Sequence, residues 1–221
     1  MYQTILFDLD GTLTDPQEGI TGCFQYALSS LGIEEKDRRR LMRVIGPPLL
    51  DSFMEFYGLD KRQATLAVEK YRERFSAIGI FENAVYPGVE EMLATLKGAG
   101  KTIALATSKP HVFAHRILEH YHLSSYFDTV VGAELDGRCS YKDEVIEAVF
   151  RNLNLNAANR KDAVMIGERR QDIEGAKKCG IDSIGVTFGY AAEGELEQAG
   201  ATYLIDSIQH LTQFLIAGEL Q

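Results

Sequence analysis

Three aspartates stand close together near the start of the chain, around an apolar run. The segment ILFDLDGTLTD, residues 5–15, contains Asp8, Asp10 and Asp15. Its apolar side chains are typical of a buried strand, where a carboxylate without a partner is costly because it loses its hydration. These acids therefore need a partner where the strand ends, and Gly11 allows the chain to turn sharply there.

Polar side chains also follow the later apolar runs of the chain. In an open parallel sheet, ligands bind beyond the carboxyl ends of the strands, so we expect these side chains to meet at one edge. Carboxylate oxygens suit Mg²⁺, which also takes water and phosphate oxygens as ligands. A bound cation would offset the clustered negative charge and favour an anionic phosphate. The residues concerned are Thr107, Ser108, Lys142, Glu168 and Asp172.

Short apolar runs alternate with helical patterns along most of the chain. Strands that alternate with helices indicate βαβ units and a parallel sheet, and uninterrupted apolar strands fit a sheet covered on both faces. We therefore predict an α/β fold, with a Rossmann-like, mostly parallel sheet flanked by helices. The predicted strands are residues 4–9, 102–107, 129–133, 163–167, 183–188 and 202–205. The predicted helices are residues 89–97, 112–121, 142–153, 173–179 and 208–215.

Residues 16–83 interrupt this alternation of strands and helices. Apolar residues recur there at helical spacing in three stretches, residues 20–31, 49–57 and 64–75, and each stretch marks one face of an amphipathic helix. We predict an all-helical cap domain of residues 16–83, inserted after the first strand. The α/β core domain would then consist of residues 1–15 and 84–221.

The composition limits the classes of partner. The 221-residue chain has a net charge of −9 and its densest basic run is DRRR, residues 37–40, which we interpret as a solvated face rather than a nucleic-acid site. Its three cysteines are far apart, which argues against disulfides and a zinc site and for a reducing compartment. No apolar run approaches membrane-spanning length. We therefore expect a cytoplasmic protein that does not bind membranes.

Other interpretations of the acidic and histidine residues are weaker. A calcium loop of the EF-hand type has glycine at its sixth position and lies between helices, whereas here glycine is fourth and a strand precedes it. Asp8 and Asp10 could simply cap a turn, but two acids on a buried strand with polar ends on other strands favour a cation site. His111 and His115 have zinc-pair spacing, yet no convincing third ligand is near, so we interpret them as surface residues.

Taken together, these motifs resemble the haloacid dehalogenase-like (HAD) hydrolase superfamily over nearly the whole chain. The resemblance rests on DxDGT, residues 8–12, on Thr107, on Lys142 and on the G-[DE]-x-x-x-D pattern of residues 167–172. The helical insert looks like a C1-type cap. The sequences VYPGV, residues 85–89, and ATSKP further resemble the phosphoglycolate-phosphatase-like branch.

The resemblance implies a catalytic role for three residues. Asp8 would be the nucleophile that forms an aspartyl-phosphate, and Asp10 would be the general acid and then the general base. Lys142 would neutralise charge on Asp8 and on the transferring group. Asp10 also argues for phosphoryl transfer, because dehalogenases that resemble the family lack this second aspartate.

The resemblance also implies two sets of binding residues. Mg²⁺ would be held by the Asp8 carboxylate, the Asp10 carbonyl and Glu168, with Asp172 nearby or acting through water. Specificity would come from the cap, where Arg43, Gly46, Pro47 and Arg72 are candidates; of these we select Arg43 as a substrate-binding residue. The groups that would contact the phosphoryl oxygens or the turn around them are Gly11, Thr12, Thr107 and Ser108.

The predicted function is a Mg²⁺-dependent phosphatase that acts on a small phosphate monoester and is a monomer or a homodimer. Phosphoglycolate and a nucleoside 5′-monophosphate are the leading substrates, and a phosphotyrosine-type ester is a further candidate. A phosphosugar mutase would use the same nucleophile and acid, but would return the phosphate to a sugar. A catalytically degenerate binding or regulatory protein is the remaining alternative. The only reason to consider it is Glu168, at a position where the family usually has aspartate.

Glutamate at position 168 adds one methylene to the usual ligand, and Mg²⁺ tolerates departures from its preferred geometry poorly. We expect Glu168→Asp to keep or raise the affinity for Mg²⁺, because it restores the usual reach of the carboxylate. Metal titration followed by phosphate release would measure this. A large loss of activity in the variant would contradict the assignment of Glu168 as a ligand.

Overall fold

Six parallel strands form the central sheet, in the order β5-β4-β1-β6-β7-β8. The computed structural model describes residues 1–218. The first strand is central, and Phe7 at its end is level with Leu105 of β4 and Ile166 of β6. The carboxyl ends of these three strands therefore meet at one edge. The strands are β1 (Thr4–Phe7), β4 (Thr102–Pro110), β5 (Thr129–Ala133), β6 (Ala163–Gly167), β7 (Asp182–Val186) and β8 (Tyr203–Ile205).

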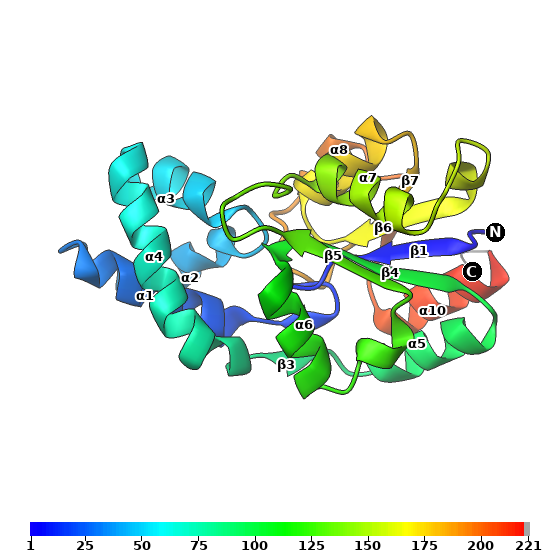
Figure 1. Ribbon diagram of the computed structural model, residues 1–221, viewed down its shortest axis with the longest axis horizontal. Helices are drawn as coiled ribbons and strands as arrows, with labels where there is room; N and C mark the ends of the chain where they lie inside the picture. Colours follow the sequence, from blue (N-terminus) through cyan, green and yellow to red (C-terminus); the bar gives the residue numbers. More distant parts are fainter. Residues whose placement is uncertain (219–221) are drawn as a thin grey trace.

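Helices cover both faces of the sheet, as Figure 1 shows. Successive side chains of a strand point to opposite faces, and β1 accordingly sends Ile5 and Phe7 into one apolar cluster and Leu6 into the other. The first cluster is completed by α5 (Val89–Gly98), α6 (His111–His120) and α10 (Ile208–Ala217). The second is completed by α7 (Lys142–Asn152) and α8 (Arg170–Lys178).

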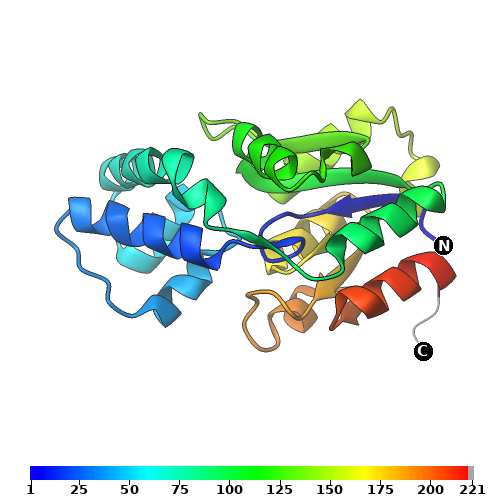
Figure 2. The ribbon, with the colours of Figure 1, turned by 90° about the horizontal axis from the view of Figure 1, so that it is seen from below.

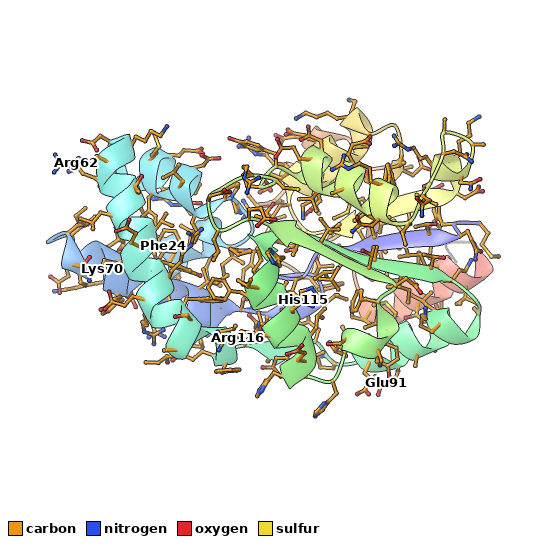
Figure 3. All side chains as sticks on the ribbon, viewed as in Figure 1. Phe24, Arg62, Lys70, Glu91, His115 and Arg116 are labelled. Atoms are coloured by element: carbon orange, nitrogen blue, oxygen red, sulfur yellow. The ribbon has the colours of Figure 1, made fainter. Side chains whose placement is uncertain are left out.

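Four helices follow the first strand and pack against one another at one end of the molecule (Figure 2). Their apolar contacts centre on Phe24, whose ring stacks on Phe53 at 4.2 Å between centroids and meets Tyr71 edge-on at 5.6 Å. Figure 3 shows Phe24 among these helices and Arg62 on their outer side. The helices are α1 (Gln17–Ser30), α2 (Arg38–Leu41), α3 (Leu49–Tyr57) and α4 (Lys61–Ala77).

Two short strands connect the helical part to the sheet. β2 (Thr14–Asp15) and β3 (Ala84–Val85) pair antiparallel, so the chain leaves and re-enters the sheet region at the same place. Beside this connection, Arg116 of α6 donates to the Ser76 carbonyl of α4 at 3.0 Å, and Figure 3 shows Arg116 on the side of α6 that faces the four helices. The two strands lie next to the expected limits of residues 16–83, although the division into two domains stays a prediction.

The predicted α/β class is confirmed, and the differences lie at element ends and in several short elements. β4 continues to Pro110, and α8 begins at Arg170, three residues before the predicted start. Four short elements were not predicted, because they are too short to carry a periodic pattern. They are β2, β3, α2 and α9 (Glu195–Ala199). Among residues 1–218, no helix has both the length and the apolar character needed to cross a bilayer. Short 3₁₀ turns span Met42–Val44, Gly79–Phe81, Ser124–Tyr126 and Asn159–Asp162.

Candidate active site

The loop after β1 folds back on itself and holds both aspartates at the sheet edge. The Leu9 carbonyl accepts from the backbone N–H groups of Leu13 at 2.9 Å and Thr14 at 3.0 Å, which closes the turn. Asp8 is still tied to β6, because its N–H donates to the Ile166 carbonyl at 2.9 Å. Asp8 and Asp10 are both buried. The sequence therefore places two carboxylates where water alone cannot balance their charge.

Lys142 lies between two of the predicted carboxylates. It is the first residue of α7, and its Nζ is 3.1 Å from Asp8 Oδ1 and 2.7 Å from Asp172 Oδ1. The same ammonium donates to the Ala106 carbonyl of β4 at 2.9 Å. Burial alone would lower the pKa of Lys142, but the charges of Asp172 and Asp8 raise it above its ordinary value. Lys142 is therefore a fixed cation within this cluster.

Asp172 lies in the first turn of α8 and forms an ion pair with Lys142. Burial raises its pKa to about 6, against the opposing effect of Lys142. Its Oδ1 forms the ion pair with Lys142 outside hydrogen-bond geometry, while Oδ2 accepts from the Arg169 N–H at 3.0 Å. The structure therefore brings Asp172 to the predicted group chiefly as a partner of Lys142.

Asp8 is oriented by two donors that contact the same oxygen. Its Oδ1 accepts from the Leu9 N–H at 2.8 Å, in addition to the contact with Lys142. Because both donors hold Oδ1, the carboxylate plane is fixed and Oδ2 is the oxygen with freedom to engage a ligand.

Asp10 pairs with a lysine that the sequence analysis left without a role. Lys109, near the end of β4, places its Nζ 2.8 Å from Asp10 Oδ2, and the ammonium lies 4.5 Å from the ring centroid of Phe75 on α4. Burial raises the pKa of Asp10, and Lys109 opposes that rise. The signal was the position of Lys109 at the polar end of this strand, directly after Thr107 and Ser108.

Glu168 is completely buried beside the turn of Gly11. Its Oε2 accepts from the Tyr190 N–H at 2.6 Å, whereas Oε1 has no hydrogen-bond partner within the part of the chain described. Burial raises the pKa of Glu168 well above its usual range, and the nearby charges of Asp172 and Asp8 raise it further. The side chain reaches the predicted cluster, with one oxygen still unsatisfied.

The donor set fits a Mg²⁺ ion that keeps part of its water shell. The buried Glu168 Oε1, an oxygen expected to hold the metal, has no hydrogen-bond partner among residues 1–218 and needs one. In the same residues, no three His, Cys, Asp or Glu side chains form a ready-made metal cluster. Mg²⁺ does not require one, because it is usually bound by one or two carboxylates, waters and substrate phosphates.

The structure brings most of the remaining predicted residues to the same edge. Thr107 is buried, and its Oγ1 accepts from the Lys109 N–H at 3.2 Å. Thr12 is buried with its hydroxyl unpartnered among residues 1–218. Ser108 lines a cavity of about 60 Å³ that lies between the sheet edge and the helices and that Asp10 also lines. Ser108 and Asp10 therefore share one cavity at this edge.

Arg43 is not brought to this group. Its side chain is exposed, donates to the Phe56 carbonyl at 3.1 Å and lies 4.5 Å from the Phe56 ring centroid. Gly46 and Pro47, which follow it, do line the cavity, as does Arg72 of α4. The assignment of Arg43 to substrate therefore finds no support in its position, whereas the other three cap candidates lie at the cavity.

Arg169 ties the helical part to the sheet and had no signal in the sequence. Its Nε is 2.9 Å from Glu195 Oε1, and its Nη1 donates to the carbonyls of Ile45 and, at 3.4 Å, Arg43. These contacts join the Arg169 side chain to backbone carbonyls 124 and 126 residues away in the sequence, and the spacing of residue types does not predict such contacts. The residue next to Glu168 therefore holds the 43–46 segment over the site.

Comparisons with known proteins agree with this geometry. The sequence profile described as "Haloacid dehalogenase-like hydrolase" matches residues 5–186. The chain belongs to this family. A 5′-nucleotidase of Pseudomonas aeruginosa is 45% identical over 97% of the chain and 96% of its own length. A phosphoglycolate phosphatase of Caulobacter vibrioides is 33% identical, over 92% and 86% respectively.

A solved structure extends the agreement to the whole fold. The "predicted phosphatase" of Clostridium acetobutylicum is 46% identical, with a TM-score of 0.94 over 98% of this chain and 99% of that one. The resemblance read from the motifs is thereby confirmed, and so is the prediction of a HAD-like phosphatase.

Gly11 provides a test of how closely the loop approaches Glu168. It has a φ of +73°, and a Cβ there would lie 2.8 Å from Glu168 Cδ. We expect Gly11→Ala to lower the free energy of unfolding by about 1–3 kcal/mol more than Gly32→Ala. Gly32 is the matched control, because its φ of +75° is similar and its Cβ would meet nothing within 4 Å. Urea denaturation measures both, and equal losses would contradict the close approach.

Proposed function

We propose that the chain is a Mg²⁺-dependent phosphatase that hydrolyses a small phosphate monoester through an aspartyl-phosphate at Asp8. The observation that carries the proposal is the buried pairing of Asp8 with Lys142, next to that of Asp10 with Lys109. The Asp8–Lys142 pair suits a nucleophile that is held in place beside a cation. The Asp10–Lys109 pair suits a residue that both gives up and takes up a proton. The family membership and the phosphatase relatives support the same chemistry.

In the first step, Asp8 Oδ2 attacks phosphorus and the bond from phosphorus to the ester oxygen breaks. The leaving oxygen takes a proton from Asp10, so that a neutral alcohol departs and Asp10 becomes a carboxylate. The Lys142 ammonium, 3.1 Å from Asp8 Oδ1, opposes the build-up of negative charge around the transferring group.

In the second step, water attacks the phosphorus of the aspartyl-phosphate. Asp10 takes a proton from that water, inorganic phosphate leaves and Asp8 is regenerated as a carboxylate. Lys109 favours the charged form of Asp10 that this step needs, and burial favours the neutral form that the first step needs. The two opposing influences suit a residue that must act as both acid and base.

Mg²⁺ would be held by the Asp8 carboxylate, the Asp10 carbonyl and Glu168, with Asp172 positioned behind Lys142. When bound, it supplies positive charge that screens the carboxylates from the phosphate dianion. The unpartnered Glu168 Oε1 supports this assignment, because a buried carboxylate oxygen needs a cation or a donor. The Thr12 and Thr107 hydroxyls, the backbone at Ser108 and the turn at Gly11 would contact the phosphoryl oxygens.

The helical insert, residues 16–83, would act as the cap that excludes water from the cavity. Phosphoglycolate and a nucleoside 5′-monophosphate are the proposed substrates, and relatives named phosphoglycolate phosphatase and 5′-nucleotidase support both. A monomeric or homodimeric state and a cytoplasmic location stay part of the proposal.

Asp8→Asn tests the proposed chemistry directly. We expect kcat for p-nitrophenyl phosphate in Mg²⁺ to fall by on the order of 10³-fold or more, because an amide oxygen cannot attack phosphorus in place of the carboxylate. The exposed, remote Asp206→Asn is the control and should keep full activity. Phosphate release that survives Asp8→Asn, or that does not need Mg²⁺, would contradict the proposal.

Lys109→Met tests the acid–base role of Asp10. Loss of the ammonium removes a partner of the carboxylate, so the pKa of Asp10 rises and the residue stays protonated to higher pH. We expect the alkaline limb of the pH profile of kcat/KM for an alkyl phosphate to move upward by on the order of one pH unit. Lys109→Arg keeps the charge and should leave the limb close to wild type. An unmoved or lowered limb in Lys109→Met would refute this role.

A further inference from the structure

The small cavity at Asp10 adjoins a much larger groove. The groove has a volume of about 530 Å³ and lies between α3 and α4 on one side and the segment 133–141 on the other. Five residues line both spaces, which shows that the two adjoin. The shared residues are Pro48, Leu49, Arg72, Ser108 and Pro110.

The size of the inner cavity limits what the inner space can hold. A volume of about 60 Å³ accommodates roughly four to six water-sized groups. Asp10, the proposed proton donor to the leaving oxygen, lines this cavity. The cavity would therefore receive the leaving group of the ester. A leaving group larger than a few heavy atoms therefore extends past Leu49 and Arg72 into the groove.

The groove offers apolar and aromatic surface at its outer wall. Leu135 and Tyr141 line it and are 45% and 56% exposed, which is unusual for side chains of their size. Leu50 and Val68 face the same space from the helices. A planar, largely apolar group gains most from such a wall, because aromatic rings stack on its face.

The charge of the groove excludes a second anion. Its lining contains four acidic side chains and two basic ones. One of the acids, Asp136, is paired with Arg138 at 2.8 Å, which leaves three acids against the two basic residues. A neutral group is thus favoured over a carboxylate or a further phosphate. The acidic residues are Asp51, Glu69, Glu134 and Asp136, and the basic ones are Lys61 and Arg72.

The junction of the two spaces carries a free donor. Arg72 Nε is buried and has no hydrogen-bond partner among residues 1–218. A buried donor in this position needs an acceptor, which a sugar hydroxyl or ring oxygen supplies.

We propose that the groove binds the nucleoside part of a nucleoside 5′-monophosphate, with the ribose beside Arg72 and the base against Leu135 and Tyr141. The inference rests on the proposed phosphatase function and names its substrate class. The linear order of cavity, donor and apolar wall matches the order of ester oxygen, sugar and base. Phosphoglycolate would leave the groove empty, and a nucleoside diphosphate would bring its extra charge toward an acidic lining.

The test compares substrates that differ by one part of the nucleotide. We expect wild-type kcat/KM to be higher for AMP than for ribose 5-phosphate or phosphoglycolate. Tyr141→Ala should raise KM for AMP about tenfold with little change in kcat, and should change the values for ribose 5-phosphate by less than about twofold. Tyr141→Phe should behave as wild type, because it keeps the ring. Tyr26→Ala, an exposed tyrosine outside the groove, is the matched control.

A binding measurement separates this inference from the proposed function. Calorimetric titration of AMP into Asp8→Asn and into Asp8→Asn/Tyr141→Ala needs no turnover, and the second protein should bind about tenfold more weakly. Equal binding, equal effects of Tyr141→Ala on AMP and ribose 5-phosphate, or a wild-type preference for phosphoglycolate would overturn the groove assignment. Absence of hydrolysis of every ester, with the binding difference intact, would overturn the phosphatase function and leave the nucleotide site standing.

The acidic lining of the groove is tested by the choice between AMP and ADP. Glu69→Lys replaces an exposed acid of the groove on α4 by a base. We expect the ratio of kcat/KM for ADP to that for AMP to rise several-fold at low ionic strength and to return toward wild type in high salt, where charges are screened. An unchanged ratio would contradict the exclusion of a second phosphate.

Discussion

The ammonium of Lys142 between Asp8 and Asp172 is the contact on which the rest of the site depends. Buried carboxylates at the end of β1 are unstable unless a cation stands beside them, and Lys142 at the start of α7 supplies that cation. The same ammonium is bonded to the Ala106 carbonyl of β4, so three neighbouring elements share one charge. The parallel order β4-β1-β6 makes this possible, because it aligns the carboxyl ends of those strands at one edge.

Much of this arrangement could be predicted, because its signals are local in the sequence. The apolar runs define the strands, and DxDGT places Asp8 and Asp10 at the end of the first. Parallel topology then requires Thr107, Lys142 and Glu168 to approach them, whatever the length of chain between. The helical insert was predictable for a similar reason, since three amphipathic stretches leave a stripe that other helices must cover.

The parts that could not be predicted depend on contacts between distant segments. Arg169 bonds to the carbonyls of Arg43 and Ile45, and backbone acceptors have no signature in the sequence. Arg43 looked as suitable as Arg72 for a cap residue, but packing on Phe56 turns it away, whereas Arg72 reaches across to Leu135. Which of two arginines on neighbouring helices faces the sheet is decided by how the helices pack.

Phe75 belongs to the helical part, whereas the pair beneath its ring, Asp10 and Lys109, belongs to the sheet. A displacement of the helices that lifts the ring would uncover the pair and hydrate it. Lys109, which opposes the rise in the pKa of Asp10, is thus in contact with both the helical part and the sheet. If the helices act as the proposed cap, their position would therefore affect the protonation of Asp10 as well as the access of water.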